Sequence, residues 1–501
     1  MLKRRGVKKF FSSSLISFTL LFFIPLFSIP LDPNPSWYYS CPASRDIAFG
    51  DVNNDGYLDL AVVREGYVNY LFRNLNGRLD SSPSWQSNDV DYTISCAFGD
   101  VDNDGYLDLA VGNYRFAGGR VKLYKNENGN LNPEPRWIAE DDGATSLAWG
   151  DVDNDGDLDL AGVDLFGYPC LFFNNEGQLE RNPSWRAVDH NLDLSCAFVD
   201  IDNDGWLDLV VGNVNWAIPL IRIYKNNNGR LETRASWRSI FPQTDYVSAD
   251  GIAVGDVNND GWLDIFVSNH MNEGVKNYGF INNQGRLDTF PNWLSNDENR
   301  SIRSYLADMD GDEDLDFAYA NVGQAMVYEN INGSLNPTPA WSSNVSHQWG
   351  IAVCDIDNDG LILKRDTFIG NGQRKLFYLK KRPVQRLVEI RVNNNPIPVS
   401  NYAIDLYNGW FTLKETPLQT SQIVVTYYYS LDLDLAFGGC YLFLNRRAPE
   451  IKEKENITKN ILNLKEGEIY NILGNKIKRG DLKKGIYFLK KEKVKEKILI
   501  K

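Results

Sequence analysis

One acidic motif recurs along the 501-residue chain and constrains its fold more than any other feature. In residues 100–113, "DVDNDGYLDLAVGN", aspartates occupy positions one, three, five and nine of the motif, and a glycine occupies position six. Copies begin at Asp51, Asp100, Asp151, Asp200, Asp256, Asp308 and Asp355, so the period is about fifty residues. A period of this length indicates a repeat architecture in which every copy is one supersecondary unit.

Each repeat contains four short segments with the character of β-strands. A segment such as "SCAFGD" (strand A) precedes the motif, "LDLAVGN" (strand B) follows it, and "RVKLYKN" (strand C) leads into an N-x-x-G turn. A tryptophan marks the last strand (D) at Trp37, Trp85, Trp137, Trp185, Trp237, Trp293 and Trp341. Repeated four-stranded antiparallel units predict a β-propeller, whereas a solenoid would need capping units that the chain does not show.

The two ends of the repeat region predict how the propeller closes. Trp37 has no A, B or C strand before it, and "LDLDLAFGGCYLFLNRR" at residues 431–447 supplies B and C strands with no D strand after them. An N-terminal D strand that completes the last blade would remove an open edge, so we predict an all-β propeller with seven four-stranded antiparallel blades. The same pairing would bring Cys41 close to Cys440, and a disulfide there is a hypothesis that their Cα separation tests.

The last repeat is interrupted. "DIDNDG" begins at Asp355, but position nine is Leu363, and the expected "LDLAFGG" comes only at residues 433–439. Alternating runs such as "VEIRV" and "IVVTYYY" predict a small β module at 361–430, inserted into the loop of the last blade. An alternative interpretation takes "DTFIGNG" at Asp366 as strand B and the remainder as an eighth, degenerate repeat.

The spacing of the motif is that of a calcium-binding loop, in which oxygen ligands surround the ion and a glycine allows the sharp turn. The side chains at positions one, three, five and nine and the main-chain carbonyl at position seven are the expected ligands for up to seven Ca²⁺ ions. The candidate ligands are Asp51, Asn53, Asp55, Tyr57, Asp59, Asp100, Asp102, Asp104, Tyr106, Asp108, Asp151, Asp153, Asp155, Asp157, Asp159, Asp200, Asp202, Asp204, Trp206, Asp208, Asp256, Asn258, Asp260, Trp262, Asp264, Asp308, Asp310, Asp312, Asp314, Asp316, Asp355, Asp357, Asp359 and Asp434. Because crowded carboxylates repel one another, we expect the ions to stabilise the fold rather than to take part in catalysis.

Charge is distributed unevenly over the chain, whose formal net charge is −14. The acidic middle argues against nucleic-acid binding. Residues 1–30, with a basic start and an apolar run, predict a cleaved export signal, after which no stretch is apolar enough to span a membrane. Six cysteines permit up to three disulfides in an exported protein, although most are expected to be small buried residues.

The sequence shows no catalytic constellation, so we do not expect an enzyme. None of His190, His270 and His347 has the spacing of a metal ligand or of a base beside a nucleophile. The D-strand tryptophans recur at a fixed place, which favours packing over sugar stacking. The B–C and D–A loops vary between repeats, and a ligand is expected on that face. The candidates there are Tyr114, Phe116, Asn215, Trp216, His270 and Asn272.

Stretches such as "FGDVDNDGYLDLAVGN" and "WGDVDNDGDLDLAGV" resemble FG-GAP repeats, also called VCBS-type repeats, which build the head propeller of integrin α subunits. The resemblance covers residues 35–360 and 432–447. It implies a seven-bladed propeller with calcium in several A–B loops. We assign residues 31–360 and 431–447 to the propeller.

The end of the chain, residues 448–501, resembles the last part of a bacterial type IX secretion sorting domain. The strands "IYNILGNKI" and "GIYFLK" and a basic final strand carry this resemblance. It implies contact with secretion machinery and a bacterial cell-surface or secreted location. The leading functional hypothesis is an exported, calcium-stabilised propeller that binds a protein or glycan in adhesion or recognition. The alternatives are a polysaccharide lyase or hydrolase on the same scaffold and a purely structural surface component.

Overall fold

The computed structural model describes residues 29–445, apart from 141, 190, 215–219, 241–246, 271–274 and 347–348, together with the backbone of four strands between 468 and 500. The expected signal at 1–30 therefore lies almost wholly outside the described residues. Within them, the structure is all-β except for two 3₁₀ turns, η1 (Arg115–Ala117) and η2 (Val399–Asn401). The described residues contain no helix that is long and apolar enough to cross a membrane.

Each repeat supplies four antiparallel strands, called a blade below and named by the first aspartate of its motif. The Asp51 and Asp100 blades are also joined into one eight-stranded sheet, in which Glu65 pairs with Tyr92 and Tyr67 pairs with Asp91. In the Asp100 blade the strand order is β6 (Asp91–Gly99), β7 (Asp108–Asn113), β8 (Lys122–Tyr124) and β9 (Trp137–Ile138). Gly99 pairs with Asp108, so the acidic loop joins two adjacent strands. All of β7 is buried, because neighbouring sheets cover both of its faces, and this explains the continuous apolar run "LAV".

The other complete repeats follow the same order. The Asp51 blade contains β2 (Ser44–Gly50), β3 (Asp59–Tyr67), β4 (Tyr70–Phe72) and β5 (Trp85–Gln86). The Asp151 blade contains β10 (Ser146–Gly150), β11 (Asp159–Val163), β12 (Cys170–Phe172) and β15 (Trp185–Arg186). Its C–D turn is a hairpin of β13 (Asn174–Asn175) and β14 (Gln178–Leu179). The Asp200 blade contains β16 (Leu192–Val199), β17 (Asp208–Val214), β18 (Ile221–Tyr224) and β19 (Trp237–Arg238). The Asp256 blade contains β20 (Gly251–Gly255), β21 (Asp264–Ser268), β22 (Tyr278–Phe280) and β23 (Trp293–Leu294), and the Asp308 blade contains β24 (Ser301–Ala307), β25 (Asp316–Asn321), β26 (Gln324–Tyr328) and β27 (Trp341–Ser346).

The interrupted repeat is completed by strands from both ends of the chain. Its order is β28 (Ile351–Cys354), β36 (Asp434–Phe437), β37 (Tyr441–Phe443) and β1 (Trp37–Tyr38). Cys41 and Cys440 form a disulfide with a Cα separation of 6.0 Å, which confirms the sequence hypothesis. The remaining cysteines, Cys96, Cys170, Cys196 and Cys354, are buried and free.

Side-chain hydrogen bonds from the C–D turns join every blade to the one before it. In the Asp51 blade, the Asn74 amide donates to the carbonyl of Leu58 in its own loop (3.2 Å) and to that of Ile356 in the Asp355 loop (2.8 Å). The equivalent donors are Asn126, Asn174, Asn226, Asn282, Asn330 and Asn445. Asn445 donates to Met309 in the Asp308 loop, so this chain of bonds returns to its starting point.

The D-strand tryptophans pack between blades, in agreement with the packing role expected from the sequence. Trp137 lies edge-on to Phe172 of the next blade, with ring centroids 5.3 Å apart, and its indole N–H donates to the carbonyl of Leu179 (3.0 Å). Trp341 repeats the arrangement against Phe443, and Trp37 repeats the ring contact against Phe72. A large aromatic ring and a satisfied N–H make this a strong inter-sheet contact.

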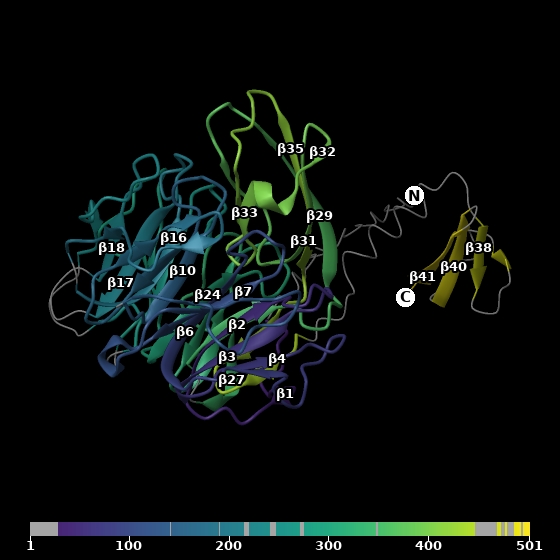
Figure 1. The fold of residues 1–501 in the computed structure, drawn as a ribbon. Coiled ribbons are helices and arrows are strands. Elements are labelled where there is room, and N and C mark those ends of the chain that lie inside the picture. The colour runs from purple at the N-terminus through teal and green to yellow at the C-terminus, as the bar shows by residue number, and fades with distance from the viewer. Residues whose placement is uncertain are drawn as a thin grey trace, which may run out of the picture.

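Residues 361–430 form two sheets of their own. One has the order β29 (Leu361–Ile369), β35 (Gln422–Ser430), β31 (Val384–Val392) and β32 (Asn395–Pro396), and the other has β30 (Leu376–Tyr378), β34 (Trp410–Leu413) and β33 (Tyr402–Asp405). Since β28 pairs with β36 and β29 pairs with β35, the interpretation of Asp366 as a strand B of an eighth repeat is wrong. Figure 1 shows these green strands rising from one side of the repeat sheets.

The C-terminal region contributes one further sheet, with the order β39 (Lys476–Ile477), β38 (Glu468–Asn471), β40 (Gly485–Lys491) and β41 (Val494–Ile500). It includes the segments that resemble the type IX sorting domain. Its residues 446–467 lie outside the described part of the chain.

Candidate metal centre

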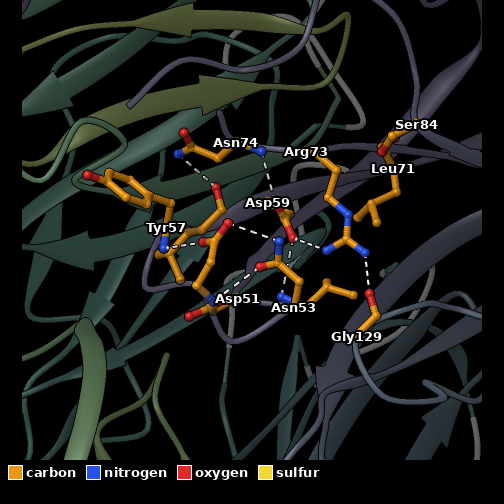
Figure 2. A network of polar contacts seen from close by, with 12 residues as sticks. Asp51, Asn53, Tyr57, Asp59, Leu71, Arg73, Asn74, Ser84 and Gly129 are labelled. Carbon is orange, nitrogen blue, oxygen red and sulfur yellow. Dashed lines mark hydrogen bonds and ion pairs between the residues drawn. The ribbon is translucent and has the colours of Figure 1, made fainter. Parts of the chain in front are cut away.

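The acidic motif folds into a tight loop whose first aspartate accepts main-chain hydrogen bonds (Figure 2). In the Asp51 loop, the carboxylate of Asp51 accepts the N–H of Asp55 (3.0 Å) and of Gly56 (2.8 Å). Asn54 and Gly56 have positive φ angles of 58° and 90°, which Asn and Gly tolerate best. The sequence N-D-G thus turns the chain around its own carboxylates.

The Asp308 loop departs from this pattern at position six, where it has Glu313 instead of glycine. Glu313 nevertheless adopts φ 83°, and its N–H donates to Asp308 (3.0 Å), as glycine does elsewhere. The strain of a left-handed non-glycine residue is therefore tolerated in this loop. The Asp308 loop keeps the geometry of its neighbours despite the altered sequence.

The ninth-position aspartate braces the loop against the C–D turn. Asp59 accepts the N–H of Val52 (3.3 Å) and of Asn74 (2.8 Å), and Asp434 accepts those of Ile356 (2.8 Å) and Asn445 (2.7 Å). The structure therefore gives this aspartate a role in holding the fold that the ligand assignment alone did not include.

Within the part of the chain that the structure describes, five loops gather carboxylates closely enough to hold a metal ion, with the ligand atoms of each group within 4.8 Å of one another. The groups are Asp100, Asp102 and Asp104; Asp151, Asp153 and Asp159; Asp200, Asp202 and Asp204; Asp308, Asp310 and Asp316; and Asp355, Asp357 and Asp359. The Asp51 and Asp256 loops have asparagine at position three, so they offer fewer carboxylates. Donor sets made only of oxygen suit Ca²⁺.

The Asp308 loop shows most clearly that its residues fit a cation. Oδ1 of Asp308 and Oδ2 of Asp310 are buried and have no hydrogen-bond partner. Burial, together with the neighbouring Asp312 and Asp308, raises the pKa of Asp310 to about 7. A buried carboxylate without a partner is unfavourable unless a cation or a proton neutralises it.

Three loops instead carry a basic side chain of their own. The Lys125 ammonium lies 2.8 Å from Asp102 and 2.6 Å from Asp108, and Lys225 bridges Asp202 and Asp208 in the same way. Arg73 lies 2.6 Å from Asp59 and also reaches the carbonyl of Gly129 (Figure 2).

These basic residues immediately precede the asparagine of the C–D turn. Other repeats have Phe173, Ile281, Glu329 and Leu444 at that place. The sequence interpretation missed this variation, although it can be read from the residue before each N-x-x-G turn.

Burial also raises the pKa of carboxylates in the other loops. The pKa of Asp100 rises to about 7 and that of Asp151 to about 7, in both cases chiefly because the group is buried. Asp159 and Asp316 have pKa values well above the ordinary range for the same reason. Without a cation, these sites would hold protons near neutral pH.

The inserted sheets cover the face that carries the acidic loops. The Thr412 hydroxyl donates to Asp151, the Arg374 guanidinium lies 3.3 Å from Asp200, and Lys375 donates to the carbonyl of Asn154 (2.8 Å). A cavity of about 350 Å³ lies between the insertion and the Asp51 and Asp100 loops. Arg386 of the insertion nevertheless reaches Gly56 of the Asp51 loop, where an added Cβ would lie 2.7 Å from its guanidinium.

The inner strands of the seven blades surround a central channel, and the turn of the insertion at residues 405–408 lies at the channel end on the acidic-loop face. The inner strands β2, β6, β10, β16, β20, β24 and β28 line a cavity of about 210 Å³ together with Asp405, Tyr407 and Asn408 of the insertion. The Tyr305 hydroxyl donates to the carbonyl of Tyr407 (3.0 Å). Arg303 crosses the channel and donates to the carbonyls of Asp250 (3.2 Å) and Thr145 (3.1 Å).

On the opposite face, residues from several blades meet near the channel. Nε2 of His270 lies 3.1 Å from Arg300 and its Nδ1 lies 3.7 Å from Asp250. Burial, Arg300 and Arg45 lower the pKa of His270 to about 4, so the ring is neutral. Arg45 stacks over Trp349 at 4.1 Å, and the His270 and Trp349 ring centroids are 5.6 Å apart.

Three of the six residues predicted on this face are described. Burial raises the pKa of Tyr114, which comes from a different blade than His270. Phe116 is 65% exposed and packs against Tyr114, with centroids 4.8 Å apart. Asn215, Trp216 and Asn272 lie outside the described residues, as do His190 and His347.

The fold and the loops define the class of protein as a β-propeller built from repeated four-stranded blades. The family profile of the FG-GAP-like repeat matches residues 51–111, 112–162, 200–267 and 308–362. These four segments are therefore similar to FG-GAP-like repeats. A search of curated proteins by sequence found no match.

Solved structures resemble the chain at low sequence identity. The crystal structure of BBS1N in complex with ARL6DN, soaked with mercury, is 12% identical, covers 78% of this chain and 99% of that chain, and has a TM-score of 0.44. An Agrocybe aegerita lectin that recognises non-reducing terminal N-acetylglucosamine is 16% identical, covers 62% of this chain and 82% of that chain, and has a TM-score of 0.40. Neither similarity extends beyond the fold.

Proposed function

We propose that the chain is an exported, calcium-stabilised, seven-bladed β-propeller that recognises a protein or a glycan at the bacterial cell surface. The observation that carries the proposal is the contrast between the two faces. The insertion covers the acidic-loop face, whereas exposed aromatic rings gather on the other. A rigid scaffold with variable loops on one open face is a common arrangement for recognition.

The exposed rings come from the B–C loops of two adjacent blades. Phe116 and Phe166 are 65% and 63% exposed, and their ring centroids are 6.3 Å apart. Tyr114 packs behind Phe116. Exposed aromatic groups of this kind mark interaction sites, because rings bury a large area with little loss of conformational entropy.

A binding array of glycans and proteins, probed with and without calcium, tests this proposal. Once a ligand is found, we expect Phe116→Ala combined with Phe166→Ala to weaken binding about tenfold or more, with an unchanged melting temperature. Phe290→Ala is the matched control, since Phe290 is also exposed but lies in another loop. Equal binding by the double variant and the control would contradict the proposed site.

A second candidate is a carbohydrate-active enzyme, either a lyase or a hydrolase. It is favoured by the neutral His270 beside Arg300, since this pair supplies a base and a group that neutralises charge. Incubation with acidic polysaccharides, followed by measurement of new reducing ends, tests it. Activity that His270→Gln abolishes would establish the enzyme, and no release from any polysaccharide would leave binding as the function.

Export is proposed from the two ends of the chain. The signal at residues 1–30 would direct the chain across the inner membrane, and the tail at 448–501 would engage type IX secretion machinery. Deletion of 448–501 in the native host should shift the protein from the cell surface to the periplasm. An unchanged surface location would contradict the sorting role.

A further inference from the structure

The base of the inserted module lies directly on the interrupted acidic loop. Leu361 at the start of β29 pairs with Ser430 at the end of β35, so the two connections leave the blade side by side. The N–H of Leu431 donates to the carbonyl of Gly360 (3.3 Å). The chain therefore returns, after the whole insertion, to the point at which the loop was interrupted.

This return restores the second half of the loop. Asp434 makes the two main-chain contacts of a ninth-position aspartate, with Ile356 and Asn445. If Asp434 stands at position nine, then Asp432 stands at position seven. Four loops have an aromatic residue at this position (Tyr57, Tyr106, Trp206 and Trp262). The split loop instead places a carboxylate there, as the Asp151 and Asp308 loops do with Asp157 and Asp314.

Asp432 is buried beside the acidic group without full hydrogen bonding. Asp432 is 6% exposed, and the Oδ1 atom of its carboxylate has no hydrogen-bond partner. A Cβ added to Gly360 would lie 2.5 Å from the Cβ of Asp432, which shows how closely the returning chain is packed against the loop. Ser430, two residues earlier, donates its hydroxyl to Asp355 (2.7 Å).

The surrounding charge is negative. Asp355, Asp357 and Asp359 bring carboxylate atoms within 4.8 Å of one another. Among the described side chains, no ion pair joins any of these three or Asp432 to a basic residue, and Leu444 replaces the lysine found in the Asp100 blade. Four carboxylates at one partly buried place are unfavourable unless a cation neutralises them.

We propose that Asp432 is a metal ligand and that one divalent cation of the calcium type binds jointly to Asp355, Asp357, Asp359 and Asp432. The inference rests on the proposed calcium-stabilised fold and extends it, because this ion is held from both sides of the insertion. It clamps the base of the inserted module to the blade. The site is specific to this interrupted repeat, since no other described loop is divided by an insertion.

A crystal of the mature protein grown with Tb³⁺, a calcium substitute with strong anomalous scattering, tests the ligand directly. The proposal predicts an ion peak in contact with the carboxylate of Asp432. An ion at the Asp355 loop without contact to Asp432, or ions in other loops with none here, would overturn this inference alone. The absence of ions from every loop would also contradict the proposed function.

Calcium titration calorimetry and limited proteolysis provide a second test in solution. We expect Asp432→Asn to weaken one binding event about tenfold or more. In calcium, this variant should be cleaved near residues 360 and 431 as readily as the chelated wild type is. The matched control is Asp157→Asn, also at position seven, because its carboxylate bonds to Asn103 (2.7 Å) and to the N–H of Glu176 (2.9 Å). Wild-type affinity and wild-type cleavage in Asp432→Asn would refute the proposal.

Discussion

The Asp100 and Asp308 loops share one motif but neutralise their carboxylates in different ways. In the Asp100 loop the Lys125 ammonium bridges Asp102 and Asp108. The Asp308 loop has Glu329 at the place of that lysine, and buried oxygens of Asp308 and Asp310 have no hydrogen-bond partner. The comparison indicates that the repeats keep one backbone geometry while their need for an external cation differs.

Replacement of Lys125, whose ammonium neutralises the Asp100 loop, should have the largest effect on stability. We expect Lys125→Met to lower the free energy of unfolding by about 2–3 kcal/mol in chelator, because buried Asp108 loses a charge-assisted hydrogen bond. In saturating calcium the loss should be smaller, since the ion replaces the ammonium. Denaturant unfolding under both conditions measures the difference.

Lys122→Met is the control for this experiment. Lys122 lies three residues before Lys125, at the start of β8, and contacts Asp89 and Asp91, which belong to no acidic motif. Its replacement should have the same effect in calcium and in chelator. If Lys125→Met behaved like this control, the proposed equivalence of the ammonium and the metal ion would be wrong.

Asp310→Asn should have a smaller effect whose sign depends on the metal. In chelator we expect a gain of about 1 kcal/mol in unfolding free energy, because one of several mutually repelling buried carboxylates is removed. In calcium the same variant should be less stable than the wild type, because a ligand is lost. Asp102→Asn in the Asp100 loop is the matched comparison. It removes one of the two carboxylates that Lys125 contacts, so it should not stabilise the chelated protein.

The pH dependence of the chelated protein should depend on the same buried carboxylates. Burial raises the pKa of Asp100, Asp151 and Asp310 from 3.8 to about 7. Because the folded state then binds more protons than the unfolded state, this contribution to stability is complete below pH 3.8 and is lost as the pH rises through 7. We expect the melting temperature in chelator to fall by about 2 °C for each of these groups between pH 5.5 and pH 8.

Calcium should reverse this trend, because protons and the ion compete for the same carboxylates. The stabilisation by calcium, measured as the difference in melting temperature from the chelated protein, should therefore be greater at pH 8 than at pH 5.5. A difference that is larger at the lower pH would contradict the assignment of these carboxylates as the binding groups.

Much of the repeat fold could be predicted because the same sequence pattern recurs in every repeat. The motif marks the A–B turn, and the lone D strand at Trp37 pairs with β37, as the unmatched ends of the chain indicated. The position of Cys440 next to Cys41 followed from that pairing. Periodicity supplied independent copies of the same local signal.

Other features could not be predicted because they depend on contacts between distant segments. Nothing in the spacing shows that Thr412 reaches Asp151 or that Tyr407 closes the channel. The role proposed for Asp432 was missed for a similar reason, since 71 residues, from 361 to 431, separate it from Gly360 in the sequence. The N-x-x-G asparagines were taken as turn formers, whereas their side chains also join adjacent blades.

The melting temperature of the purified, chelator-stripped protein, followed as calcium is added back, tests the central claim most directly. At a calcium concentration 100 times the dissociation constant, each occupied site should add about 2.7 kcal/mol to the free energy of unfolding. The account predicts a melting temperature that rises steadily with the logarithm of calcium concentration. Superimposable melting curves in chelator and in millimolar calcium would contradict it.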